Sequence, residues 1–152
     1  MKTTNFQEID QDIQKQLEAA REASKKVFPR DRDVAIGAVV VADDGRVFEG
    51  ANSVKERFIT STCAERMALD KALFEGINKI KRIVIIGENK DYPFTEVASP
   101  CGNCRQMIWD TLDDLGQEDV ELVLANSGMS KVVITTVKEL LPLAYKSSRN
   151  NA

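Results

Sequence analysis

The sequence predicts one α/β domain, a three-layer α/β/α sandwich built on a five-stranded mixed sheet. Short runs rich in Val and Ile alternate with helical patterns, the arrangement of a sheet covered by helices. Residues 34–41 read VAIGAVVV, a nearly unbroken apolar run typical of a strand buried on both faces. The last two predicted strands, 120–125 and 131–136, are joined by about five residues. That link is too short for a parallel crossover, so we expect this pair to be antiparallel.

The composition fits a single globular domain. A chain of 152 residues with 43% hydrophobic and 30% charged residues is long enough to bury a core. A net charge of −3 and a pI near 5.1 argue against a nucleic-acid partner, which usually meets a basic surface. The first residues carry no apolar signal segment, and no window reaches the length of a membrane span. We therefore expect no membrane partner and a reducing, cytoplasmic setting.

The first half of the chain should form a helix, a hairpin and a second helix. Asn5 followed by Glu8 indicates the start of an amphipathic helix over about 6–28, ended by Pro29. After the strand 34–41, an Asp-Asp-Gly turn at 43–45 leads into a return strand at 46–51. A polar loop then precedes a helix from Cys63 to about residue 75, which Gly76 ends.

The second half continues the alternation. The predicted elements are a strand at 83–86, a helix at about 100–115 ended by Gly116, the strands at 120–125 and 131–136, and a last helix from about Thr136 that carries Leu140, Leu141, Leu143 and Tyr145. We expect residues 1–152 to form one domain, with the core over 34–145 and a frayed tail over 146–152.

The three cysteines point to a metal site. Cys101 and Cys104 are two residues apart, a spacing that lets both sulfurs bind one tetrahedral zinc. With Ser99 as N-cap and Pro100 as first helical residue, both thiols would lie at a helix N-terminus, where the peptide dipoles favour thiolates. Cys63, with Thr62 as its cap, should begin a second such helix. The chain contains no histidine, so a soft metal here depends on sulfur.

Three thiolates leave one zinc position open, as in catalytic zinc sites, whereas structural sites use four protein ligands. Glu65 follows Cys63 in the same turn, within reach of a water on that metal. Each signal has an alternative reading taken alone. Thr62 and Glu65 could form a capping box, Cys63 could be a small buried apolar residue, and Cys101 with Cys104 could be a redox pair. Their combination favours catalytic zinc.

These motifs resemble the cytidine deaminase family, in particular its small, single-domain branch with three cysteines. The resemblance rests on TCAER at 62–66, SPCGNCRQ at 99–106 and ELLP at 139–142, and extends from about Val34 to Tyr145. It implies hydrolytic deamination of cytidine or deoxycytidine to the uridine product and ammonia. Zn²⁺ would be held by Cys63, Cys101 and Cys104, and Glu65 would be the catalytic proton shuttle. The antiparallel final pair of strands favours the nucleoside branch over relatives that edit nucleic acids.

The resemblance also implies roles around the metal. Arg66 would be the cation beside the thiolates, although a surface helix charge is the alternative reading. The Ala64 N–H would hold the ring carbonyl and Asn52 would contact the sugar. Tyr145 would reach the site of a neighbouring subunit in a homo-oligomer, a tetramer by resemblance, or else simply pack at a helix end.

The sugar-contacting loop departs from the family pattern. Val54 stands where the family has a ribose-binding Glu, and a valine side chain accepts no hydrogen bonds. The identity of the sugar therefore stays open. The alternatives are a deaminase of a modified or non-nucleoside aminated heterocycle, as in the similar blasticidin S deaminase, and a zinc-stabilised binding module without catalysis.

Overall fold

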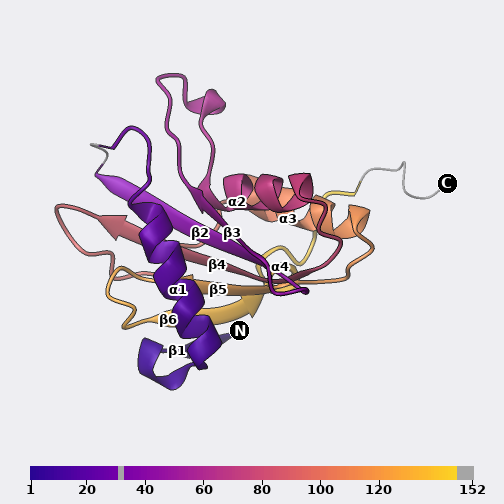
Figure 1. The fold of residues 1–152 in the computed structure, drawn as a ribbon, viewed down its shortest axis with the longest axis horizontal. Coiled ribbons are helices and arrows are strands. Elements are labelled where there is room, and N and C mark those ends of the chain that lie inside the picture. Colours follow the sequence, from indigo (N-terminus) through magenta and orange to yellow (C-terminus); the bar gives the residue numbers. More distant parts are fainter. Residues whose placement is uncertain (31–32, 147–152) are drawn as a thin grey trace.

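The computed structural model describes residues 1–30 and 33–146 and centres on a six-stranded mixed sheet (Figure 1). The strand order is β1-β6-β5-β4-β2-β3. The strands are β1 (Lys2–Thr4), β2 (Val34–Ala42), β3 (Val47–Ala51), β4 (Ile80–Asn89), β5 (Glu121–Ala125) and β6 (Val132–Thr136). β4 and β5 are parallel, while β5 and β6 are antiparallel. The predicted direction of the last two strands is thus confirmed.

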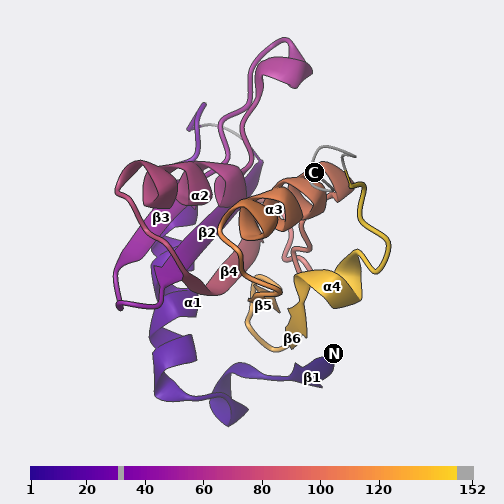
Figure 2. The same cartoon turned by 90° about the vertical axis from the view of Figure 1, so that its right-hand side faces the viewer.

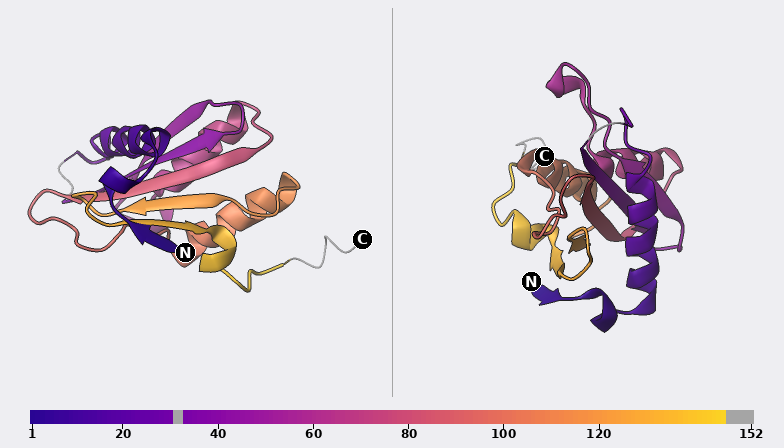
Figure 3. Two further views of the ribbon diagram at one scale, coloured as in Figure 1. Left: turned by 90° about the horizontal axis from the view of Figure 1, so that it is seen from below. Right: turned by 90° about the vertical axis from the view of Figure 1, so that its left-hand side faces the viewer.

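The prediction of five strands was wrong, because the N-terminus adds a sixth. β1 pairs antiparallel with β6, with Lys2 opposite Ile134 and Thr4 opposite Val132. Figure 3 shows this short strand at the sheet edge beside β6. Three residues are too few to show an alternating pattern, and the strand exists because the free edge of β6 offers unpaired backbone groups.

Helices cover both faces of the sheet, which confirms the three-layer sandwich (Figure 2). α1 lies on one face, and α2 and α3 lie on the other. The α-helices are α1 (Gln11–Ser24), α2 (Ala64–Phe74), α3 (Gly102–Asp114) and α4 (Val137–Leu140), and the 3₁₀ turns are η1 (Phe6–Glu8) and η2 (Phe58–Thr60). Across the described ranges, 1–30 and 33–146, no helix combines the length and apolar character needed to cross a bilayer.

The first helix is shorter than the predicted 6–28. The Asn5 side chain accepts a hydrogen bond from the Gln7 N–H and so caps the 3₁₀ turn η1, while α1 begins only after Asp10. Beyond Ser24 the chain leaves the helix, and Phe28 instead forms a bridge with Ser53. Of the predicted frayed tail, residues 147–152 lie outside the described residues.

Alternating side chains of the central strands fill two separate cores. On β2, Ala38 and Val40 face α2 and α3, whereas Val39 and Val41 face α1. Every second residue of β4 and β5 follows the same division. Because both faces are covered, the strands are apolar throughout rather than alternating, as the run at 34–41 predicted.

Gly50 lets α2 touch the sheet, and we predict that Gly50→Ala is destabilising. A Cβ there would lie 2.1 Å from the Ala64 carbonyl oxygen and 2.6 Å from the Ala68 nitrogen. Both are backbone atoms, so α2 must move away, at a cost of about 2 kcal/mol or more of unfolding free energy. Urea denaturation measures this, with Gly128→Ala as control, since its Cβ meets only Ser130 Oγ at 3.9 Å. Equal stability of the two variants would contradict the close packing of α2.

Candidate metal centre and active site

The three cysteines converge at the N-termini of two helices. α2 begins directly after Cys63, and α3 begins directly after Cys101 and contains Cys104. Their sulfur atoms all lie within 4.8 Å of one another. Sulfurs bound to one tetrahedral zinc at about 2.3 Å are separated by about 3.8 Å. The cluster therefore fits a zinc ion after a small contraction, and its all-thiolate chemistry suits that metal.

Helices α2 and α3 both begin later than predicted, because the predicted N-cap residues Thr62 and Ser99 form hydrogen bonds with other parts of the chain. The N-cap residues are Cys63 and Cys101 themselves. Thr62 instead exchanges two backbone hydrogen bonds with Ser53, and the Ser99 hydroxyl accepts a hydrogen bond from Arg105. The capping-box reading of Thr62 with Glu65 is therefore wrong. The thiols still lie at the helix starts, as the zinc site requires.

The thiols differ in environment. Cys104 is buried, Cys63 is partly buried and Cys101 is exposed, and all three are free of disulfides. A hydrogen bond with Cys104 lowers the pKa of the Cys63 thiol to about 7. The same hydrogen bond, together with burial, raises the pKa of Cys104 well above its usual range. This hydrogen-bonded pair of thiols lies where a bound cation would replace the proton.

Glu65 is a buried carboxylate beside the thiol cluster. Its side chain lies in the first turn of α2 and is 5% exposed. After the thiol–thiol hydrogen bond and burial, its negative charge is the next cause that raises the pKa of Cys104. It is not part of the sulfur group itself, and it lines the adjoining pocket. A carboxylate thus lies beside the thiol cluster at the wall of the pocket.

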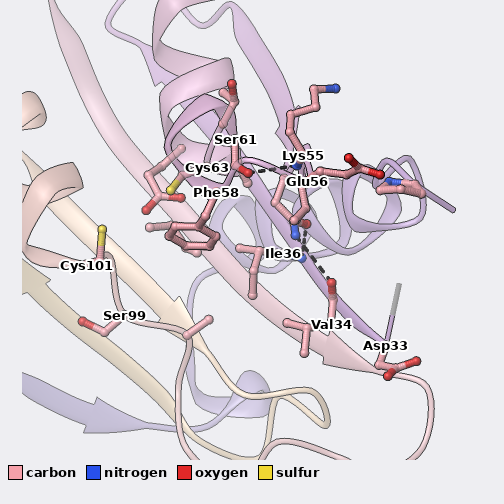
Figure 4. Close-up of a pocket in the computed structure, with 18 residues that line it drawn as sticks. Asp33, Val34, Ile36, Lys55, Glu56, Phe58, Ser61, Cys63, Ser99 and Cys101 are labelled. Atoms are coloured by element: carbon pink, nitrogen blue, oxygen red, sulfur yellow. Dashed lines mark hydrogen bonds between the residues drawn. The ribbon is translucent and has the colours of Figure 1, made fainter. Parts of the chain in front are cut away.

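The pocket beside the cluster has a volume of about 1010 Å³. Figure 4 shows Cys63, Ser99 and Cys101 on one side of it and Asp33, Val34 and Lys55 on the other. Apolar side chains form much of the remaining wall, namely Pro29, Ile36, Val54, Phe58, Ile85 and Ala98. The pocket thus joins a polar, thiol-bearing end to a largely apolar wall.

Two of the predicted substrate contacts line this pocket. Ala64 is the first residue of α2 and is fully buried. The Asn52 side chain accepts a hydrogen bond from the Ile36 N–H at 2.8 Å and donates to the Val34 carbonyl at 3.4 Å. These bonds tie Asn52 to β2 and fix its amide at the pocket wall. Sequence reasoning missed Phe58, Lys55 and Glu56, which also line the pocket from the loop before α2.

Arg66 and Tyr145 occupy different surroundings. The Arg66 Nε is buried and has no hydrogen-bond partner within residues 1–30 and 33–146. The guanidinium nevertheless acts on Cys63, adding to the lowering of its pKa by Cys104. Tyr145 is 73% exposed, and its backbone N–H and C=O both bond the Gln106 side chain. It is not among the residues that line the pocket of its own chain.

The sandwich fold and the three-thiol cluster beside a buried carboxylate define a zinc-binding α/β enzyme. Residues 10–113 match the cytidine and deoxycytidylate deaminase zinc-binding region. A cytidine deaminase from Halalkalibacterium halodurans is 33% identical over 76% of this chain and 80% of its own length. A blasticidin-S deaminase from Bacillus cereus is 28% identical over 95% of this chain and 98% of its own length.

A solved structure agrees with these matches. The crystal structure of cytidine deaminase from Burkholderia pseudomallei superposes with a TM-score of 0.74 at 32% identity, covering 90% of this chain and all of that one. The chain belongs to the cytidine deaminase family.

Proposed function

We propose that this chain hydrolyses the exocyclic C–N bond of cytidine or deoxycytidine, giving the uridine product and ammonia. The observation that carries the proposal is the buried Glu65 carboxylate beside three converging thiols at the wall of a pocket. Cys63, Cys101 and Cys104 would hold a zinc ion, which would supply the Lewis acid that makes water nucleophilic near neutral pH. Family membership supports both the metal and the reaction.

Glu65 is proposed as the proton carrier. Its carboxylate takes a proton from the attacking water and passes it to the ring nitrogen next to the amine-bearing carbon. Glu65 then takes the proton of the newly added hydroxyl and delivers it to the amine, which leaves as ammonia as the C–N bond breaks and the carbonyl of the uridine product forms. One group thus serves as base and acid in turn. Burial beside the cluster holds it close to both partners.

Neighbouring groups are proposed to bind and orient the pyrimidine nucleoside. The Ala64 N–H, at the start of α2 and at the pocket wall, is the proposed donor to the ring carbonyl. Asn52 faces the same pocket and is the proposed sugar contact. The Arg66 guanidinium, whose Nε is buried, offsets part of the negative charge of three thiolates.

We expect ammonia release from cytidine by the zinc-loaded protein, and its loss after treatment with a chelator. A coupled ammonia assay and the ultraviolet spectrum of the pyrimidine measure both. Activity on neither cytidine nor deoxycytidine would contradict the proposed substrate. Metal-free protein with a reversible disulfide between Cys101 and Cys104 would favour a redox pair instead.

A second candidate substrate is an aminated heterocycle with another substituent in place of ribose. Val54, Val34 and Ile36 line the pocket with side chains that accept no hydrogen bonds from sugar hydroxyls, and the Bacillus cereus relative is a blasticidin-S deaminase. The same assay run with cytidine, deoxycytidine, cytosine, blasticidin S and guanine separates the candidates. Failure with every aminated ring would favour a zinc-stabilised binding module.

The proposal includes a homo-oligomer in the cytoplasm. Exposed apolar side chains at Phe58, Ile59, Leu143 and Tyr145 support contacts with further copies, for which the family resemblance suggests a tetramer. Three free thiols that must stay reduced to hold a metal support a reducing compartment.

A further inference from the structure

Of the three metal-binding thiols, Cys101 has the least support from its own surroundings. Cys104 is fully buried within α3, and the residue before Cys63 is fixed by the two backbone hydrogen bonds between Thr62 and Ser53, each 2.8 Å. Cys101 is exposed and lies at the end of a loop, outside the first turn of α3. Interactions other than burial must therefore orient the Cys101 sulfur toward the sulfurs of Cys63 and Cys104.

Arg105 contacts each residue of the segment that carries this thiol. Its Nε donates to the Pro100 carbonyl at 2.8 Å, and its Nη2 bonds the Ser99 hydroxyl at 3.0 Å. Its backbone N–H donates to the Cys101 carbonyl at 2.9 Å, the first helical bond of α3. The rigid, planar guanidinium fixes the loop in two directions at once.

The same side chain reaches the C-terminal segment. Arg105 Nη1 donates to the Leu140 carbonyl at 3.1 Å, at the end of α4. The next residue, Gln106, holds the backbone of Tyr145 by two hydrogen bonds of 2.9 Å. α3 therefore fastens the chain after β6 to the loop that carries Cys101.

We propose that Arg105 is a positioning residue for the metal site, which fixes the Cys101 thiol by tying residues 99–101 to the end of α4. It acts through the backbone of the loop, and it is neither part of the thiol cluster nor among the residues that line the pocket. Outer contacts of this kind typically change metal affinity by about 10–100-fold. The inference concerns metal binding, so it stands apart from the choice of nucleoside.

The test measures zinc affinity by competition with a chromophoric chelator, without any substrate. We expect Arg105→Ala to raise the zinc dissociation constant by about 10–100-fold. Arg105→Lys should give an intermediate value, because an ammonium cannot span the same acceptors. The matched control is Arg21→Ala, which removes a bond to Glu88 Oε1 and one to the Ser127 carbonyl. It should change zinc affinity by less than about twofold.

A second readout separates positioning from general stability. Thermal unfolding of the metal-free variants should show similar losses for Arg105→Ala and Arg21→Ala, while cobalt-substituted Arg105→Ala shows an altered thiolate absorption. If Arg105→Ala does not fold, Ser99→Ala and Arg105→Lys carry the test, and both should weaken zinc binding. Zinc affinity within twofold of the parent in the folded Arg105 variants would overturn the proposal.

Discussion

Replacing Glu65 by Gln should abolish nearly all turnover while leaving the zinc content and fold intact. Glutamine has almost the same shape as glutamate, so the buried site stays filled, but an amide cannot accept and return a proton at neutral pH. General acid–base catalysis by one group contributes roughly 10²–10⁴-fold. Because Glu65 is proposed to act in both proton transfers, we expect kcat to fall by about 10⁴-fold, toward the upper end of that range.

The control for this prediction is Glu56→Gln, which removes a carboxylate from the exposed part of the same pocket. That change should leave kcat within a few fold of the parent. Metal analysis and thermal unfolding of both variants show whether the Glu65 effect is chemical. Substantial turnover by a zinc-loaded Glu65→Gln enzyme would refute the proton-carrier role.

The chemistry of the site could be predicted from local sequence because its ligands lie in two short motifs. Cys63 and Glu65 share one helical turn, and Cys101 and Cys104 share another, so only the meeting of the two helices depends on the fold. The identities of the thiols and the absence of histidine already specify a soft metal with an open position. The structure adds the convergence of the three sulfurs to within 4.8 Å.

The structural features that sequence analysis did not predict depend on contacts between segments far apart in the chain. β1 forms because residues 132–134 offer a free edge, and nothing within residues 2–4 shows this. Ser99 looks like a cap by residue type, yet its hydroxyl is bound by Arg105 six residues on. Phe58 reaches the pocket because of the path taken by the loop before α2. Such features follow from tertiary placement, which overrides local preference.

Substitution of Cys101 and of Cys104 should distinguish the stability that comes from metal binding from the stability that comes from packing of the buried sulfur. Cys104→Ala and Cys101→Ala each remove one of three ligands, so we expect both to lose tight zinc binding and nearly all activity. With free zinc at a thousandfold excess over its dissociation constant, the parent gains roughly 4 kcal/mol from the metal. Both variants should lose most of that stabilisation, as measured by denaturant unfolding with and without zinc.

In the metal-free state the two variants should differ. Cys104 is 0% exposed, so removing its sulfur leaves a small cavity that costs about 1 kcal/mol. Cys101 is exposed, and its replacement should change metal-free stability by less than about 0.5 kcal/mol. Each variant is thus the control for the other. Retention of stoichiometric, tightly bound zinc by either one would show that the metal is held elsewhere, because two remaining thiolates cannot reproduce a three-sulfur site.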